Sequence, residues 1–412
     1  MAEKVVLAFS GGLDTSVAVR WLQAERGYEV IALTVDVGLD REGKAIEERA
    51  HAAGAAAYRL IDAREDFIRY FAFPALAAGA LYQGRYPLAT ALARPLIAKL
   101  MVDVAREEGA QAVAHGCTGK GNDQVRFDVS IQALAPELRI VAPLREWEMK
   151  TREDEIEYAQ KHNIPVEATK KSPYSLDENL WGRAIESGPL EDPWTEPPED
   201  AFGWTKSIAD APDKAAYVEI GFERGLPVSL DGKNVDGVSL VTRLNELAGE
   251  HGVGRIDHVE DRLVGIKSRE VYEAPAAMTL LRAHEALEAL TLSKQQLRLK
   301  GSIAQEYADL IYNGLWFTAH HQDLAHYVQS SQRHVTGTVR MRLHKGSATA
   351  AGSKSPRSLY TAALATYEKG DEFDASAAVG FIKIWGLPVR VQAEAQLLAD
   401  KDDTLRIAAP EE

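Results

Sequence analysis

A run of mostly small and polar residues directly after the first apolar stretch could hold a phosphate group. The segment SGGLDTS, residues 10–16, separates apolar residues 5–9 from a helical pattern at 13–25. Its glycines allow a tight turn and a close approach of the backbone to a ligand. A helix starting here directs unpaired N–H groups and the positive end of its dipole at that ligand. A simple helix cap needs only one polar residue, so we predict a phosphate-binding loop.

A second polar cluster, HGCTGKGNDQVRFD, occupies residues 115–128. It follows an apolar run at 112–115, so it should lie at the same sheet edge as the first loop. Lys120 and Arg126 supply positive charge. Thr118 could bind a carboxylate, and Asp123 could orient an amine. The alternative interpretation is a solvated turn that ends in a helix cap.

Strands and helices must alternate to position these two loops. Apolar runs predict strands at 5–9, 29–36, 58–61, 112–115 and 139–144. Helical spacing is found at 13–25, 42–53, 64–108, 123–134 and 151–162. This alternation predicts an α/β domain, with a twisted parallel sheet covered by helices on both faces. Ligands of such sheets bind at the carboxyl ends of the strands.

The pattern changes after residue 165 to an α+β one. We expect strands at 217–222 and 227–230, two more within 255–268, and an edge or half-solvated strand at 335–344. Helices are expected at 238–251, 275–290 and 294–313, and residues 186–214 should form an irregular connection. Residues 374–384 have helical spacing, and residues 393–412 should form a mobile polar tail. The expected domains are 1–165, 166–369 and 370–412.

Composition limits the functions that this chain can have. With 412 residues, two or more domains are expected. The net charge of −14 argues against partners such as nucleic acid or a membrane surface. A single cysteine, Cys117, excludes an intrachain disulfide and a Cys-rich metal site. Without a signal-peptide pattern or a long apolar span, the protein is expected to be cytoplasmic.

The first loop resembles the PP-loop of the ATP pyrophosphatase superfamily, whose signature is S-G-G-x-D-[ST]. It matches neither the Walker loop nor the G-x-G-x-x-G motif. The resemblance implies binding of the pyrophosphate end of ATP, with Mg²⁺, and cleavage between the α- and β-phosphates.

Longer motifs resemble the argininosuccinate synthase family in the right order, over residues 4 to 392. They are HGCTGKGNDQVRF at 115–127, RYPLAT at 85–90, ARP at 93–95, PYSLDENLWGR at 173–183, LEDPW at 190–194, HGVGR at 251–255, GIKSREVYE at 265–273, VTG at 335–337 and GFIKI at 380–384. The resemblance implies an ATP-binding domain, a synthetase and multimerisation domain, and a C-terminal oligomerisation arm in a homotetramer.

The resemblance also implies a set of ligand contacts. ATP should contact Ala8, Phe9, Ser10, Gly11, Gly12, Leu13, Asp14, Thr15, Ser16, Val35 and Gly116. Aspartate should contact Thr118, Asn122 and Asp123. Citrulline should contact Tyr86, Thr90, Asn122, Arg126, Ser175, Glu260 and Tyr272. Ala91 and Ala184 belong to the citrulline set by position, but each stands where the family usually has serine, which removes two hydroxyls.

The implied reaction begins when the ureido oxygen of citrulline attacks the α-phosphorus of ATP, forming an adenylate and releasing pyrophosphate. The amine of aspartate then displaces AMP. Positioning and charge neutralisation provide most of the catalysis. In this scheme Asp14 organises Mg²⁺, Lys120 stabilises phosphate charge and Asp123 orients the amine.

Other interpretations stay open at this point. Cys117 could be a nucleophile, although a small residue in a tight loop explains it more simply. Amidotransferases and tRNA sulfur-transfer enzymes use reactive cysteines, and NAD synthetase would leave the second half of the chain unexplained. A non-catalytic nucleotide sensor would need the first loop alone. His320, His321 and His326 are interpreted as surface residues, and no protein metal site is predicted.

Overall fold

The computed structural model describes residues 2–38, 43–165 and 173–397. The chain divides into two compact units, residues 1–359 and residues 360–412. Among the described residues, no helix combines the length and apolar character needed to cross a membrane.

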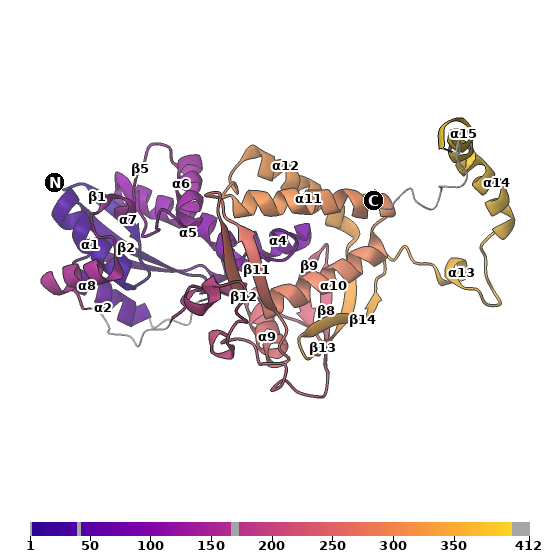
Figure 1. Ribbon diagram of the computed structural model, residues 1–412, viewed down its shortest axis with the longest axis horizontal. Helices are drawn as coiled ribbons and strands as arrows, with labels where there is room; N and C mark the ends of the chain where they lie inside the picture. Colours follow the sequence, from indigo (N-terminus) through magenta and orange to yellow (C-terminus); the bar gives the residue numbers. More distant parts are fainter. Residues whose placement is uncertain (1, 39–42, 166–172, 398–412) are drawn as a thin grey trace, which may run out of the picture. The chain divides into compact units, whose positions relative to one another are not determined.

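The first strands form a parallel sheet in the order β3-β2-β1-β4-β5. This sheet belongs to the N-terminal part of the chain, drawn in indigo to purple in Figure 1. They are β1 (Lys4–Ala8), β2 (Glu29–Asp36), β3 (Ala57–Asp62), β4 (Ala112–Ala114) and β5 (Arg139–Val141). The order runs outward from β1 to β3 and then resumes on the other side of β1. The switch point therefore lies between β1 and β4, where ligands of such sheets bind. The predicted parallel α/β domain is confirmed.

Helices cover both faces of this sheet, as the sequence predicts. Val5 and Leu7 of β1 pack with α1 (Leu13–Arg26), α2 (Gly43–Ala53) and α8 (Arg152–Lys161). Val6 points to the opposite core, which contains α5 (Ala89–Glu108) and α6 (Asp123–Leu134). This alternation follows from the two-residue period of a strand. It directs the loops after β1 and β4 to the same edge of the sheet.

The prediction of one helical region at 64–108 is wrong. The segment contains α3 (Arg64–Phe67), a π-helical turn (Ile68–Ala72), α4 (Phe73–Ala78) and finally α5. Helix α4 ends because Gly79 takes the left-handed conformation, with φ +72°, and Leu88 has φ +66° immediately before α5. The turn between them carries Tyr86, and α4 packs against helices of the second half of the chain.

The strand expected at 139–144 is also shorter than predicted. It ends at Val141, and Pro143 opens the short helix α7 (Pro143–Glu146) instead. Proline has no N–H to donate to a sheet and suits the first turn of a helix.

The second half of the first unit contains two antiparallel sheets. One has the order β10-β9-β8-β13-β14 and the other β11-β12-β7-β6. The strands are β6 (Ser175–Asn179), β7 (Gly182–Glu186), β8 (Ala216–Glu223), β9 (Leu226–Leu230), β10 (Lys233–Asn234), β11 (Arg255–Asp261), β12 (Lys267–Glu273), β13 (Gly337–His344) and β14 (Ser347–Lys354). The helices are α9 (Gly237–Glu250), α10 (Pro275–Thr291), α11 (Lys294–Tyr312) and α12 (Ala319–Ser331).

The sequence predicts most of this α+β half, but not its polar strands. Strands β6, β7, β10 and β14 and helix α12 were not predicted. Strand β13 pairs with both β8 and β14, so it is not an edge strand, but its alternating burial confirms the half-solvated alternative. The connection expected at 186–214 contains only the short 3₁₀ turns η2 (Gly188–Glu191) and η3 (Glu199–Ala201).

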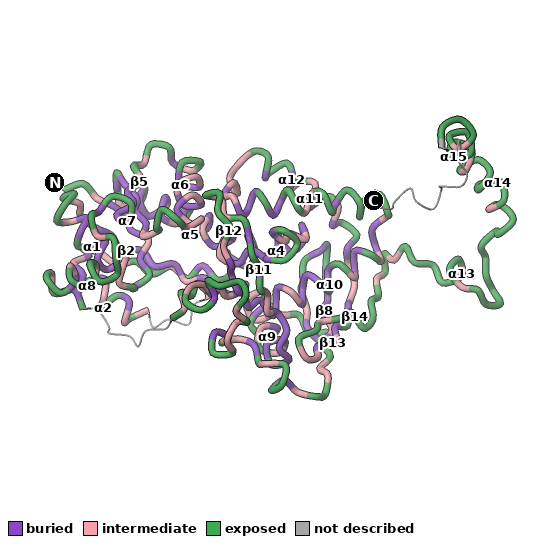
Figure 2. The backbone as a smooth tube through the Cα atoms, in the orientation of Figure 1, coloured by how far each residue is buried: buried purple, intermediate pink, exposed green. Residues whose placement is uncertain are grey.

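The second unit contains α13 (Ala362–Ala365), α14 (Ala375–Trp385), α15 (Leu387–Gln392) and a π-helical turn, Ala393–Leu397. The helix expected at 374–384 is confirmed as α14, which Asp374 caps. Residues 398–412 of the predicted tail lie outside the described residues. Figure 2 shows that this unit is largely exposed, in contrast to the sheets of the first.

Candidate active site

A cavity of about 460 Å³ opens at the carboxyl ends of β1 and β4. Helix α5 and the antiparallel strands β6, β7, β11 and β12 supply its other walls. The predicted site residues on its lining are Ala8, Phe9, Ser10, Thr15, Val35, Tyr86, Thr90, Gly116, Thr118, Asn122, Asp123, Arg126, Ser175, Ala184, Glu260 and Tyr272. Residues assigned from the sequence to three different ligands therefore share one cavity.

The other predicted site residues are not part of this lining. They are Gly11, Gly12, Leu13, Asp14, Ser16, Ala91 and Lys120. Ala91 lies on α5 and is fully buried in the hydrophobic core, whereas Lys120 is exposed.

The loop after β1 is held by its own polar groups. The Ser10 Oγ accepts a hydrogen bond from the Gly12 N–H at 3.3 Å, and the Thr15 hydroxyl donates to the Gly12 carbonyl at 3.3 Å. Gly11 has φ +75°, and a Cβ there would lie 3.3 Å from a side-chain carbon of Ile46. Gly12 precedes α1 without a side-chain cap. The open helix start leaves backbone N–H groups for a phosphate.

Two carboxyl groups lie beside this loop. Asp14, in the first turn of α1, contacts Glu155 of α8. Burial, followed by the negative charge of Asp14, raises the pKa of Glu155 to about 8. The Glu155 Oε2 is buried and has no hydrogen-bond partner among the described residues. Two carboxyl groups this close repel each other when both are ionised, so the pair favours binding of a cation between them.

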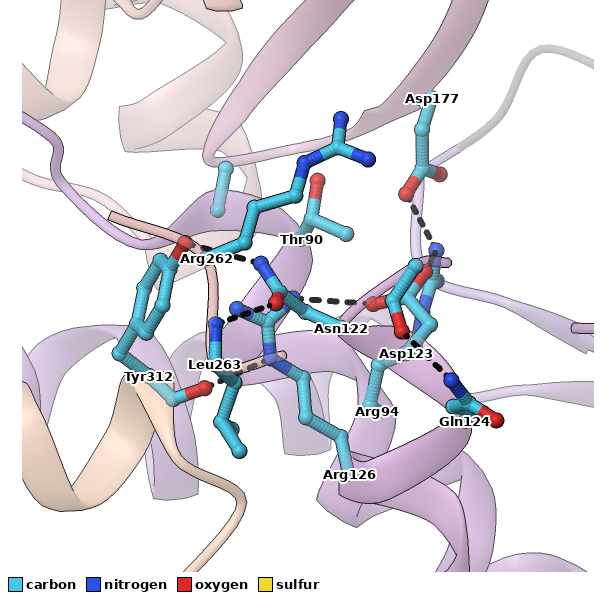
Figure 3. A network of polar contacts seen from close by, with 12 residues as sticks. Thr90, Arg94, Asn122, Asp123, Gln124, Arg126, Asp177, Arg262, Leu263 and Tyr312 are labelled. Atoms are coloured by element: carbon cyan, nitrogen blue, oxygen red, sulfur yellow. Dashed lines mark hydrogen bonds and ion pairs between the residues drawn. The ribbon is translucent and has the colours of Figure 1, made fainter. Parts of the chain in front are cut away.

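Arginines surround the carboxylate of Asp123 (Figure 3). The Arg94 Nη2 donates to its Oδ2 at 2.7 Å, and the Arg126 Nη1 donates to its Oδ1 at 2.9 Å. Burial would raise the pKa of Asp123, but the two guanidinium groups lower it below the ordinary value. Arg94 also pairs with Asp177, whose pKa is raised by burial. The ionised Asp123 can therefore act only as a hydrogen-bond acceptor.

Arg94 and Asp177 line the cavity but were not assigned a role from the sequence. Arg94 stands four residues after Thr90, so both lie on the same face of α5. This spacing was a signal that could have identified Arg94. Asp177 lies in the PYSLDENLWGR motif two residues after Ser175, and the alternation of a strand would place both on one face, but strand β6 was not predicted.

Another wall of the cavity, formed by Tyr86, Ala184, Glu260 and Tyr272, contains stacked aromatic rings and a buried carboxylate. The rings of Tyr86 and Tyr272 stack with centroids 4.1 Å apart. The Tyr272 hydroxyl donates to the Glu260 Oε2 at 2.6 Å, and the Tyr86 hydroxyl accepts from the Thr90 N–H at 2.9 Å. Tyr272 is paired in register with Ala184 of β7, which places Ala184 on the same wall. This wall offers flat apolar surface together with one fixed acceptor.

Cys117 is half-buried in the loop after β4, and burial raises the pKa of its thiol. A protonated thiol is a poor nucleophile, so the structure favours the simpler interpretation of this residue. The prediction that His320, His321 and His326 all lie on the surface is wrong for His321. It is buried, and its ring packs against Trp316 and Tyr307.

The glycine-rich loop after the central strand β1 opens into a polar cavity walled by antiparallel strands, an arrangement suited to an enzyme that binds a nucleotide beside other substrates. Residues 4–165 match the model of the arginosuccinate synthase N-terminal HUP domain, and residues 174–392 match that of the arginosuccinate synthase C-terminal domain. The chain belongs to the argininosuccinate synthase family.

Individual relatives agree with this assignment. The chain is 57% identical over 402 residues to an argininosuccinate synthase of Dehalococcoides mccartyi, covering 98% of this chain and 99% of that protein. It is 56% identical over 392 residues to one of Listeria welshimeri, covering 95% of this chain and 96% of that protein.

Proposed function

We propose that this ligase joins citrulline to aspartate, using ATP and releasing AMP and pyrophosphate. The supporting observation is one shared cavity. It is lined by the loop after β1, by Asp123 with its two arginines, and by Tyr272 with Glu260. The ATP, aspartate and citrulline contacts are those assigned from the sequence, except Ala91, which is fully buried. Those that line the cavity are supported by its geometry.

The proposed chemistry needs no covalent enzyme intermediate. The ureido oxygen attacks the α-phosphorus, the P–O bond to pyrophosphate breaks, and citrullyl adenylate forms. The neutral amine of aspartate then attacks the ureido carbon, its surplus proton is lost, and the C–O bond to AMP breaks. Asp123 accepts a hydrogen bond from that amine, while Arg94 and Arg126 attract carboxylates.

Mg²⁺ accompanies ATP in this proposal. The oxygens of Asp14 and Glu155 are the hard donors that Mg²⁺ prefers, and the buried, unpartnered Glu155 Oε2 fits such a charge. When bound, the ion neutralises phosphate charge. The described residues hold no cluster of three or more His, Cys, Asp or Glu suited to a metal, so ATP phosphates and water would complete its coordination. Lys120, an exposed residue of the loop after β4, would stabilise phosphate charge.

The remaining assignments are also proposals. Residues 1–165 form the ATP-binding domain, 166–369 the synthetase and multimerisation domain, and 370–412 the oligomerisation arm of a homotetramer. The protein works in the cytoplasm on small molecules, without a nucleic-acid or membrane partner, which the net charge of −14 supports.

A substrate-omission assay tests the proposed function. Pyrophosphate should appear with ATP, Mg²⁺ and citrulline, and AMP should be released in every turnover only when aspartate is added. A nucleotide sensor would release neither product, and NAD synthetase would require deamido-NAD. Turnover without citrulline would contradict the proposal.

The two alanines in the citrulline set should behave differently. Ala184 lines the cavity, so Ala184→Ser should lower the citrulline KM by up to about tenfold, the effect of one added neutral hydrogen bond. Ala91 is fully buried, so Ala91→Ser should leave that KM unchanged. The KM for ATP is the internal control for both variants. Equal changes of the citrulline KM in the two variants would contradict the placement of Ala184, but not Ala91, on the cavity wall.

Deletion of residues 370–412 should yield smaller species by light scattering. Helix α14 exposes Phe381, Ile382, Ile384 and Trp385, each more than three-fifths exposed. A free arm would rarely leave such a patch in water, so its burial in an assembly is expected. An unchanged tetramer after the deletion would rule out this role for the arm.

A further inference from the structure

Tyr312, the last residue of α11, joins cavity residues that come from both halves of the chain. It is completely buried and was not identified from the sequence. Its hydroxyl donates to the Glu260 Oε1. The same hydroxyl accepts from the Asn122 Nδ2 at 2.8 Å (Figure 3). Asn122 precedes α6 at the edge of the parallel sheet, whereas Glu260 lies on β11. One phenol oxygen thus connects the two walls of the cavity.

The surroundings fix Tyr312 in place. Its ring stacks on that of Tyr82, with centroids 3.6 Å apart and planes 7° apart. Its carbonyl accepts from the Arg126 Nε at 2.9 Å, and the Arg126 guanidinium lies 4.8 Å from the ring centroid. Because ring and backbone are both held, the hydroxyl has little freedom to leave its two partners.

The hydrogen bonds also fix the direction of each donor. The Asn122 Oδ1 accepts from the Leu263 N–H at 2.9 Å, so the amide nitrogen must face Tyr312. The Tyr312 hydroxyl, which has one proton, then donates its hydrogen bond to the Glu260 Oε1. The Glu260 Oε2 accepts a hydrogen bond from the Tyr272 hydroxyl. The carboxylate is therefore held from two sides, and its remaining lone pairs can accept from a ligand in the cavity.

We propose that Tyr312 is a positioning residue for citrulline, acting through Glu260 and Asn122; this rests on the proposed function, in which both contact that substrate. Tyr312 holds the Glu260 carboxylate in the orientation that receives a donor group of citrulline. It also sets the distance between Asn122 and Glu260, because its hydroxyl bonds both.

Tyr312→Phe tests this role, since it removes the hydroxyl and keeps the stacked ring. The citrulline KM should rise about tenfold or more, as expected for a lost hydrogen bond to a charged group. The KM for ATP should stay within about twofold, because the hydroxyl has no bond to the loop after β1. Tyr307→Phe, another buried tyrosine of α11, is the matched control and should leave both values unchanged.

A double-mutant cycle shows whether Tyr312 acts through Glu260. If it does, Glu260→Gln combined with Tyr312→Phe should raise the citrulline KM by less than the product of the two single effects. An unchanged citrulline KM in Tyr312→Phe, strictly multiplicative effects, or an equal rise for ATP would each overturn the inference. A wild-type enzyme that does not require citrulline would overturn the proposed function and the inference together.

Discussion

Glu273→Leu should destabilise the protein by about 3–5 kcal/mol, the loss typical of breaking a buried, paired charge. The carboxylate, at the end of β12, is completely buried. It accepts from the Arg183 Nη1 at 2.7 Å and from the backbone N–H groups of Gly203, Trp204 and Thr205 at 2.8–2.9 Å. The Thr205 hydroxyl adds a bond at 2.7 Å. Leucine removes the acceptor of the three backbone N–H groups, and the Arg183 Nη1 keeps only its bond to the Ala201 carbonyl.

Denaturant unfolding followed by fluorescence measures this effect. Glu219→Leu is the control, because Glu219 makes an exposed ion pair with Arg340, and such pairs contribute little to stability. The midpoint should therefore fall strongly in the Glu273 variant and hardly at all in the control. Equal midpoints in the two variants would mean that the irregular connection after β7 does not depend on Glu273.

Asp123→Ala should reduce kcat/KM for aspartate by two or more factors of ten, roughly 3 kcal/mol or more of transition-state stabilisation. The change removes the acceptor proposed for the attacking amine, and with it the carboxylate that both Arg94 and Arg126 contact. ATP affinity should change much less, because the loop after β1 is held by its own hydrogen bonds.

Gly11→Val should give the reverse pattern in the same kinetic and nucleotide-binding measurements. Valine strongly disfavours φ +75°, and its Cβ would approach Ile46, so the loop should be distorted and ATP binding weakened. Similar losses of nucleotide affinity in both variants would contradict the division of the cavity into an ATP end and an aspartate end.

The sequence predicts those parts of the fold that follow from local patterns. Continuous apolar strands and amphipathic helices determine the parallel sheet, and small polar residues after β1 and β4 identify two of the cavity walls. The polar strand β14, with sequence SATAAGSK, has no comparable pattern, because an edge strand needs little burial. The left-handed Leu88 that separates α4 from α5 is equally invisible in the sequence, since leucine rarely takes that conformation.

Contacts between distant residues explain what the sequence missed in the site. Tyr312 bonds Asn122 across 190 positions and Glu260 across 52. No periodicity of α11 distinguishes Tyr312 from an ordinary core tyrosine. The family resemblance supplied Glu260 and Tyr272, but the hydrogen bonds that orient them are visible only in three dimensions.

The transfer of oxygen from citrulline to AMP tests the central claim most directly. Citrulline labelled with ¹⁸O in its ureido group is incubated with the enzyme, ATP, Mg²⁺ and aspartate, and AMP is analysed by mass spectrometry. Attack of the ureido oxygen on the α-phosphorus predicts one ¹⁸O atom in each AMP formed and none in pyrophosphate. Unlabelled AMP formed alongside argininosuccinate would contradict the adenylate mechanism.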